Sequence, residues 1–211
     1  MTSNVKRVYI AILRGEFLLN IFHHWVSMEE IKEGYTRVSS ILQQWDTFGH
    51  IDKEVLARKA ALGTRVHEAI DDHHEGIYTP LEFAESGYFD SYCKWEEEVK
   101  PRIIHNEARY YCDKLMITGQ VDAIIEMPGD KVPVLVDYKT SANESPKMWP
   151  LQACYYYYLA KENGVELSTR LIFLKLDRAG DFPKVCEYKY TKKLWDVCLS
   201  AWTTYRYFKC T

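Results

Sequence analysis

The spacing of apolar residues gives the chain a helical first half and a second half rich in strands. Recurrence at i, i+3 and i+4 predicts amphipathic helices in the first half. In chain order these helices are expected over residues 5–25, within 35–45 after a turn at Gly34, over 53–74 and over 81–100. Asp52 is a suitable N-cap for the third helix and Gly76 a suitable stop, while Pro101 ends the fourth.

After Pro101 the chain becomes β-branched and aromatic, which predicts strands. Three strands separated by short polar turns are expected as an antiparallel meander over residues 107–112, 115–127 and 131–141. The elements expected beyond them are a helix from Pro150 to Gly164, strands over 169–176 and 184–190, and a C-terminal helix. The order helix–β–β–β–helix–β–β–helix predicts an α/β fold, with a central mixed sheet flanked by helices.

Composition places the chain among ordinary globular proteins. Its 211 residues are 47% hydrophobic and 27% charged, which suits one domain with a small helical lobe. The formal net charge of −3 divides into −8 over residues 1–144 and +5 over residues 145–211. The basic C-terminal third is suited to facing an anion, although a solvated surface of mixed charge explains the imbalance equally well.

Cysteine and apolar patterns exclude several classes. The six cysteines form no C-x-x-C pair and no close cluster, which argues against zinc ribbons and the common iron–sulfur sites. The apolar run from Val8 to Leu13 ends at Arg14 and is too short for a secretory core, and no run approaches the about 18 apolar residues of a membrane helix. We therefore expect an intracellular protein with reduced thiols and no membrane association.

Two aspartates occupy matching positions in the second and third predicted strands. If the turn centres on Gly129 and Asp130, Asp122 lies directly opposite Asp137, with Cβ atoms about 4.5–5.5 Å apart. Such carboxylates repel each other and require a proton or a cation, and they suit Mg²⁺ or Mn²⁺. Lys139 points to the same face as Asp137 and is suited to stabilising negative charge in a transition state, although an isolated D-x-K is more often a surface ion pair.

Further polar residues recur at helical spacing. His67 follows Gly63 by one turn, which leaves room for its imidazole to reach a metal or a phosphate; a core histidine is the commoner reading. The zinc-protease pattern H-E-x-x-H fails, because Asp71 stands where the second histidine belongs. Gln152 and Tyr156 lie side by side on the helix after the D-x-K strand, where they can approach the same site or simply pack in the core.

The order of these short motifs is more specific than any one of them. Along the chain they are G-T-R-V-H (63–67), G-Q-V-D (119–122), V-D-Y-K-T (136–140) and Q-A-C-Y-Y (152–156). The series resembles the PD-(D/E)XK nuclease superfamily, and within it the RecB-like exonucleases, including phage and mitochondrial genome-maintenance exonucleases without an iron–sulfur cluster. The resemblance implies a restriction-endonuclease-like core over residues 51–211, preceded by an N-terminal helical segment, residues 1–50.

The resemblance also implies roles for individual residues. The metal ligands would be His67, Asp122, Asp137 and the backbone carbonyl of Tyr138, holding Mg²⁺ or Mn²⁺. Catalysis would depend on Asp122, Asp137 and Lys139. Gln152 and Tyr156 match the motif that contacts DNA. If a second ion binds, Glu68 or Glu107 is the candidate ligand.

The function expected from the resemblance is metal-dependent hydrolysis of DNA from single-stranded ends, in replication, recombination or repair. A helicase or single-strand-binding protein is a possible partner, and the setting is the cytoplasm or, for a viral protein, the host cell. Three alternatives stay open: a catalytically inactive DNA-binding or structural subunit, a structure-specific endonuclease, and a metal-dependent enzyme acting on another substrate.

Overall fold

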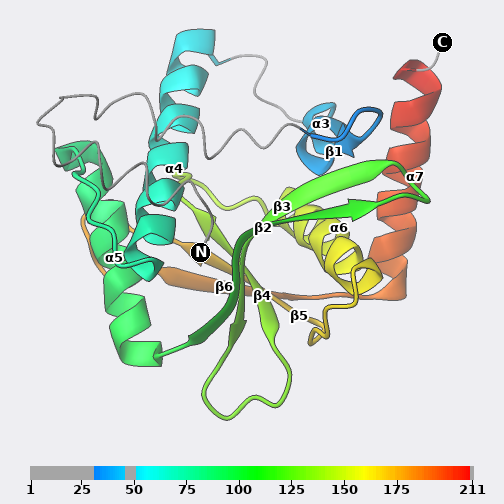
Figure 1. The fold of residues 1–211 in the computed structure, drawn as a ribbon. Helices are drawn as coiled ribbons and strands as arrows, with labels where there is room; N and C mark the ends of the chain where they lie inside the picture. Colours follow the sequence, from blue (N-terminus) through cyan, green and yellow to red (C-terminus); the bar gives the residue numbers. More distant parts are fainter. Residues whose placement is uncertain (1–30, 46–50, 210–211) are drawn as a thin grey trace, which may run out of the picture. The chain divides into compact units, whose positions relative to one another are not determined.

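The computed structural model describes residues 31–45 and 51–209 (Figure 1). The chain divides into two units, Met1–Glu33 and Gly34–Thr211, and the second carries the fold described below. The helix expected over residues 5–25 lies outside the described residues.

A mixed six-stranded sheet forms the centre of the unit Gly34–Thr211. Its strands are β1 (Thr36–Arg37), β2 (Arg102–Cys112), β3 (Ile117–Glu126), β4 (Val134–Lys139), β5 (Arg170–Lys175) and β6 (Lys184–Lys189). Strands β2, β3 and β4 form the predicted antiparallel meander, β5 runs parallel to β4, and β6 closes the edge antiparallel to β5. The short strand β1 pairs in parallel with the beginning of β3.

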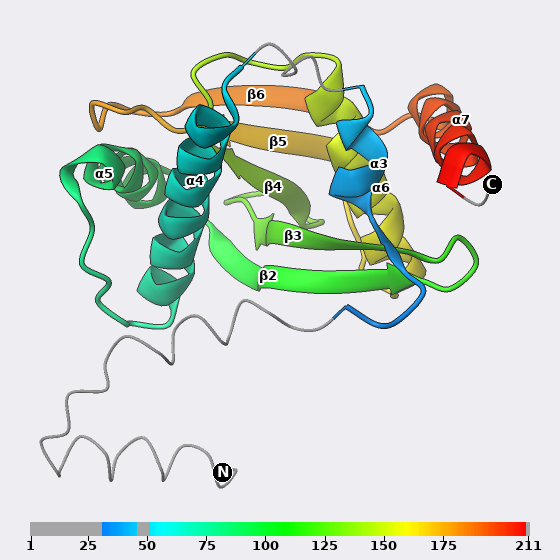
Figure 2. The ribbon, with the colours of Figure 1, turned by 90° about the horizontal axis from the view of Figure 1, so that it is seen from above.

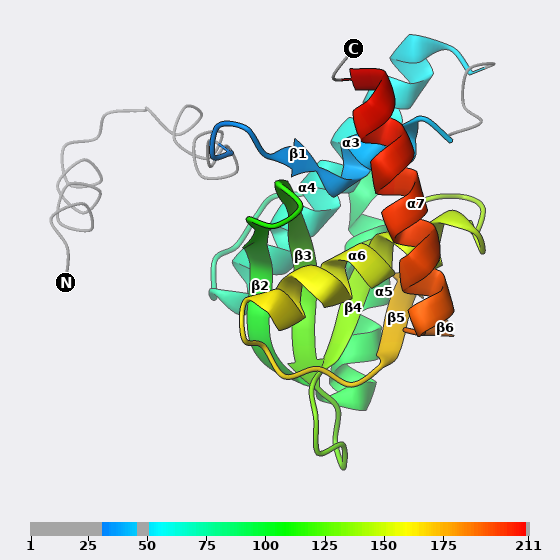
Figure 3. The same ribbon diagram turned by 90° about the vertical axis from the view of Figure 1, so that its right-hand side faces the viewer.

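Helices cover both faces of the sheet, which confirms the predicted α/β fold. They are α3 (Val38–Gln43), α4 (Lys53–His74), α5 (Phe83–Val99), α6 (Met148–Glu162) and α7 (Lys192–Lys209). Figures 2 and 3 show α6 on one face, with α3 and α7 on its side, and α4 and α5 on the other. In β5, Leu171 and Phe173 join the core under α6, whereas Ile172 and Leu174 join the core under α4 and α5. None of the described helices is long and apolar enough to cross a membrane.

Helix ends follow local chemistry closely. The Asp52 side chain accepts hydrogen bonds from the first turn of α4, as predicted. Glu82 and Glu85 form a reciprocal capping box at the start of α5, which ends at Lys100 in a left-handed conformation just before Pro101.

Several boundaries differ from the predictions, and three of them have a clear physical reason. Strand β2 begins at Arg102 rather than Glu107, because an edge strand that pairs on one side tolerates the polar residues that interrupt its pattern. Helix α6 begins at Met148, so that Pro150 lies inside its first turn rather than at its start. The segment 36–37, expected as a turn, is a strand too short to show any periodicity.

Residues 36–43, which the sequence division assigned to the N-terminal segment, belong to the core of the second unit. Val38, Ile41 and Leu42 of α3 are buried in the cluster formed with α6 and α7.

Gly87 lets α5 lie close to the backbone of the segment after β5. A Cβ atom at this position would lie 1.9 Å from the backbone oxygen of Arg178, far inside van der Waals contact. Because backbone atoms cannot yield as a flexible side chain does, Gly87→Ala should lower the free energy of unfolding by about 3 kcal/mol. Chemical denaturation checks this, with Glu97→Ala on the exposed side of α5 as the control at within about 0.5 kcal/mol. Equal stability of the two variants would show that the contact is not tight.

Candidate metal centre

The site lies where the backbone ladder between β3 and β4 ends. The predicted register is confirmed, since Ala123 pairs with Val136 and the two preceding residues of β4 continue it. The ladder stops at that pair, one position before Asp122 and Asp137 would meet. The backbone N–H of Tyr138 instead donates to Oδ2 of Asp122 at 2.7 Å. Asp122 therefore takes a hydrogen bond from the partner strand with its carboxylate, which holds that carboxylate between the strands.

Asp137 is a carboxyl group buried inside the protein. Its residue is 1% exposed, and among the described residues its oxygens accept no hydrogen bond and have only the ion pair with Lys139. Burial, and then the neighbouring charge of Asp122, raise the pKa of Asp137 above its ordinary value. The ammonium of Lys139 forms an ion pair with Oδ2 of Asp137 and lies 5.4 Å from the centre of the Phe173 ring.

His67 approaches this point from α4. Its Nε2 lies 3.1 Å from the backbone oxygen of Tyr138. Because a carbonyl oxygen only accepts, Nε2 carries the hydrogen, and Nδ1 faces Asp122 and Glu107, with each Nδ1–oxygen distance 3.6 Å. Gly63 allows the approach, since a Cβ there would lie 3.3 Å from Oγ1 of Thr140, the residue that follows β4.

This arrangement attracts positive charge to Nδ1 of His67. Burial disfavours the charged imidazole, but the charges and hydrogen bonds of Asp122 and Glu107 outweigh it and raise the pKa of His67 well above its ordinary value. A hydrogen bond from the second ring nitrogen to a carbonyl is also the usual way in which a metal-binding histidine is oriented.

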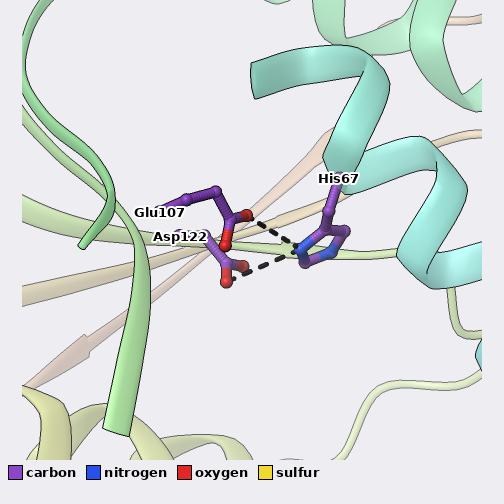
Figure 4. A group of neighbouring side chains, drawn as sticks. All are labelled: His67, Glu107 and Asp122. Atoms are coloured by element: carbon purple, nitrogen blue, oxygen red, sulfur yellow. Dashed lines mark ion pairs between the residues drawn. The ribbon is translucent and has the colours of Figure 1, made fainter. Parts of the chain in front are cut away.

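Glu107 joins the site from β2. The pairs on either side of it, Asn106 with Ala123 and Ala108 with Val121, bring it level with Asp122. Its backbone takes the left-handed φ of 44°, uncommon for a residue other than glycine. Ligand atoms of His67, Glu107 and Asp122 lie within 4.8 Å of one another (Figure 4). Glu107 was expected only as a ligand of a second metal ion, whereas here it lies beside His67 and Asp122. Glu68, the other candidate, is outside this group.

Gln152 and Tyr156 lie on the inner side of α6. The side-chain amide of Gln152 donates to the Tyr156 hydroxyl at 3.2 Å, and the Tyr156 residue is buried. Burial, followed by the charges of Asp137 and Asp122, raises the pKa of Tyr156. The ring occupies the space above Gly119, where a Cβ would lie 2.6 Å from a ring carbon. The glycine of G-Q-V-D is thus explained by this contact, which the sequence analysis missed.

The mixed sheet flanked by helices is consistent with a restriction-endonuclease-like fold. The profile described as the PD-(D/E)XK nuclease superfamily matches residues 36–202, and the chain belongs to this superfamily. Among curated proteins, none matches the chain. The solved structure described as "Crystal structure of SSO0001" is 12% identical, with a TM-score of 0.42, over 83% of this chain and 77% of that chain.

Nucleases of this superfamily use divalent metal ions, and the residues present fit such an ion. An imidazole nitrogen and carboxylate oxygens suit Mg²⁺ or Mn²⁺. The carboxyl groups of Asp137, Asp122 and Glu107 meet only two cationic side chains among the described residues, Lys139 and His67, so a divalent ion suits the charge of the site.

Proposed function

We propose that the chain is a metal-dependent deoxyribonuclease that degrades DNA from single-stranded ends. The observation that carries the proposal is the buried carboxyl of Asp137, which is paired with Lys139 and lies near Asp122. With Glu107 added, three carboxyl groups meet two cationic side chains, Lys139 and His67, and this surplus of acidic groups favours a bound divalent ion.

The metal would be held by His67, Glu107 and Asp122, with Asp137 near Asp122. The carbonyl of Tyr138, expected as a further ligand, instead accepts from Nε2 of His67, the ring nitrogen turned away from the carboxylates. When bound, a divalent ion would polarise the scissile phosphate and lower the pKa of a water molecule.

Lys139 would supply a positive charge at the site of reaction, which the metal ligands themselves do not provide. Its ammonium is held by Asp137 and is largely shielded from solvent, so its interaction with negative charge is strong. In the transition state of phosphodiester hydrolysis negative charge grows on the phosphoryl oxygens, and a fixed ammonium stabilises it.

The exonuclease activity is supported by the four ordered motifs, which resemble the RecB-like branch. In that branch the positions of Gln152 and Tyr156 contact DNA, and here both side chains stand on α6 beside the carboxylates. Single-stranded ends, a role in replication, recombination or repair inside the cell, and a helicase or single-strand-binding partner belong to the same proposal.

Digestion of end-labelled DNA tests the function. Single- and double-stranded oligonucleotides are incubated with the protein and Mg²⁺, Mn²⁺ or EDTA. We expect stepwise shortening of the single strand with either metal and none with EDTA, and no cleavage by Asp137→Ala, which excludes a contaminating nuclease. An inactive wild-type protein that still binds DNA would identify a DNA-binding subunit, and internal cuts would identify an endonuclease.

The basic C-terminal third should contribute to DNA binding. Lys147 and Arg178 are exposed, and Lys175 lies next to Lys139 across β4 and β5. Binding to single-stranded DNA should weaken with salt, with a slope of log K against log salt of roughly −0.7 per phosphate contacted. Alanine at Lys147 and Arg178 should flatten that slope in fluorescence anisotropy titrations with EDTA, whereas Lys131→Ala should not. A slope unchanged by all three variants would exclude this surface from the DNA path.

A further inference from the structure

The carboxylate of Glu107 is held from outside the site by a chain of two hydrogen bonds. The side-chain amide of Gln120 donates through Nε2 to Oε2 of Glu107 at 2.6 Å. A guanidinium nitrogen of Arg109 in turn donates to Oε1 of the same amide. Arg109 and Gln120 are direct cross-strand partners on β2 and β3, so the backbone ladder sets their separation.

The two hydrogen bonds can run in only one direction, from Arg109 through Gln120 to Glu107. A guanidinium has donors and no acceptor, so the oxygen of the Gln120 amide must face Arg109. The amide nitrogen must then face Glu107, where it fixes Oε2. The other oxygen of Glu107, Oε1, is left directed at Nδ1 of His67, at 3.6 Å. Arg109 therefore determines which atom of Glu107 faces the metal centre.

The side chain of Arg109 is partly buried between the strands and solvent. Its Nε atom is buried and, among the described residues, has no hydrogen-bond partner. Arg109 stands two residues from Glu107 on the same strand, so both side chains point to the same face of the sheet.

We propose that Gln120 and Arg109 are positioning residues of the metal centre, which orient Glu107 as a ligand without touching the ion or the substrate. The proposal rests on the proposed function, because it assigns Glu107 to the ion that the nuclease would use. Partners that orient a ligand typically change metal affinity or activity by about 10–100-fold when they are removed.

Calorimetric titration of Mn²⁺ into the DNA-free protein tests the proposal. Gln120→Met and Arg109→Met retain side-chain length but remove one link each, and each should raise the Kd for Mn²⁺ by about 10–100-fold. Both residues act through the same pair of hydrogen bonds. The Kd of the double variant for Mn²⁺ should therefore be no higher than that of the single variant with the higher Kd. Arg109→Lys, which keeps a cationic donor, should recover part of the affinity. Should a methionine variant not fold, Gln120→Asn, whose shorter side chain withdraws the amide from Glu107, replaces it.

Arg102→Met is the matched control. Arg102 pairs with Glu126 on the same two strands, at their exposed other end, and its loss should leave the Kd within about twofold. Loss of stability in the Gln120 and Arg109 variants without a change in Kd would overturn the proposal, and so would additive losses, which would mean that Arg109 acts independently.

Failure of the proposed nuclease function and failure of the positioning role give different results. Wild-type protein that binds Mn²⁺ with the expected dependence on Gln120 but cleaves no DNA would remove the proposed function and keep the positioning role. Normal metal-dependent cleavage with an unchanged Kd in both variants would remove the positioning role alone.

Discussion

Lys139→Ala should lower DNA cleavage by about 10²–10³-fold, or roughly 3–4 kcal/mol of transition-state stabilisation, while DNA affinity stays close to wild type. The ammonium lies beside Asp137 in a largely buried position, where its effect on developing charge is large. It contributes little to ground-state binding, because the substrate is held over a wider surface. Its loss should therefore reduce kcat more than it changes KM. Single-turnover cleavage and anisotropy binding measure the two effects separately.

Two further variants sharpen this test. Lys139→Arg should stay largely inactive, since a planar guanidinium cannot occupy the space of a compact ammonium. Lys189→Ala, on the exposed side of β6, should cleave as the wild type does. If Lys139→Ala cleaves DNA at a rate near wild type, the proposed mechanism is wrong, and another group stabilises the transition state.

Asp137→Asn should abolish metal-dependent stabilisation and raise the stability of the metal-free protein. At 100 times the Kd, a bound ion adds about 2.7 kcal/mol to the free energy of unfolding, and this gain should disappear when the carboxylate charge is removed. In EDTA the variant should melt at a higher temperature than wild type, because the repulsion between Asp137 and Asp122 is gone. Thermal denaturation with EDTA and with Mn²⁺ measures both changes.

Asp181→Asn is the control for this substitution, since Asp181 is an exposed carboxylate distant in sequence from the site. It should retain the full gain in Tm on addition of Mn²⁺. An Asp137→Asn protein that gains as much as wild type would place the ion elsewhere and contradict the assignment of Asp137 to the metal centre.

Much of the α/β architecture can be read from local patterns. The alternation of apolar residues and the turn at Gly129 and Asp130 suffice to predict the β2–β3–β4 meander and the register that pairs Ala123 with Val136. The cap of α4 at Asp52 and the end of α5 before Pro101 likewise depend on neighbouring residues alone. Such features are predictable because their causes lie within a few residues of one another in the chain.

What the sequence by itself determined is the order of helices and strands along the chain, the meander register and the short motifs that carry His67, Asp122 and the D-x-K residues. Only the tertiary structure decided that the β3–β4 ladder stops before Asp122. The carboxylate of Asp122 therefore accepts a hydrogen bond from the backbone of Tyr138, and Asp122 and Asp137 do not form a cross-strand pair. It also decided that Glu107 belongs beside Asp122. The reason is physical: these contacts depend on how α4 and α6 pack against the sheet and on a left-handed residue within β2, and neither leaves a periodic trace in the sequence.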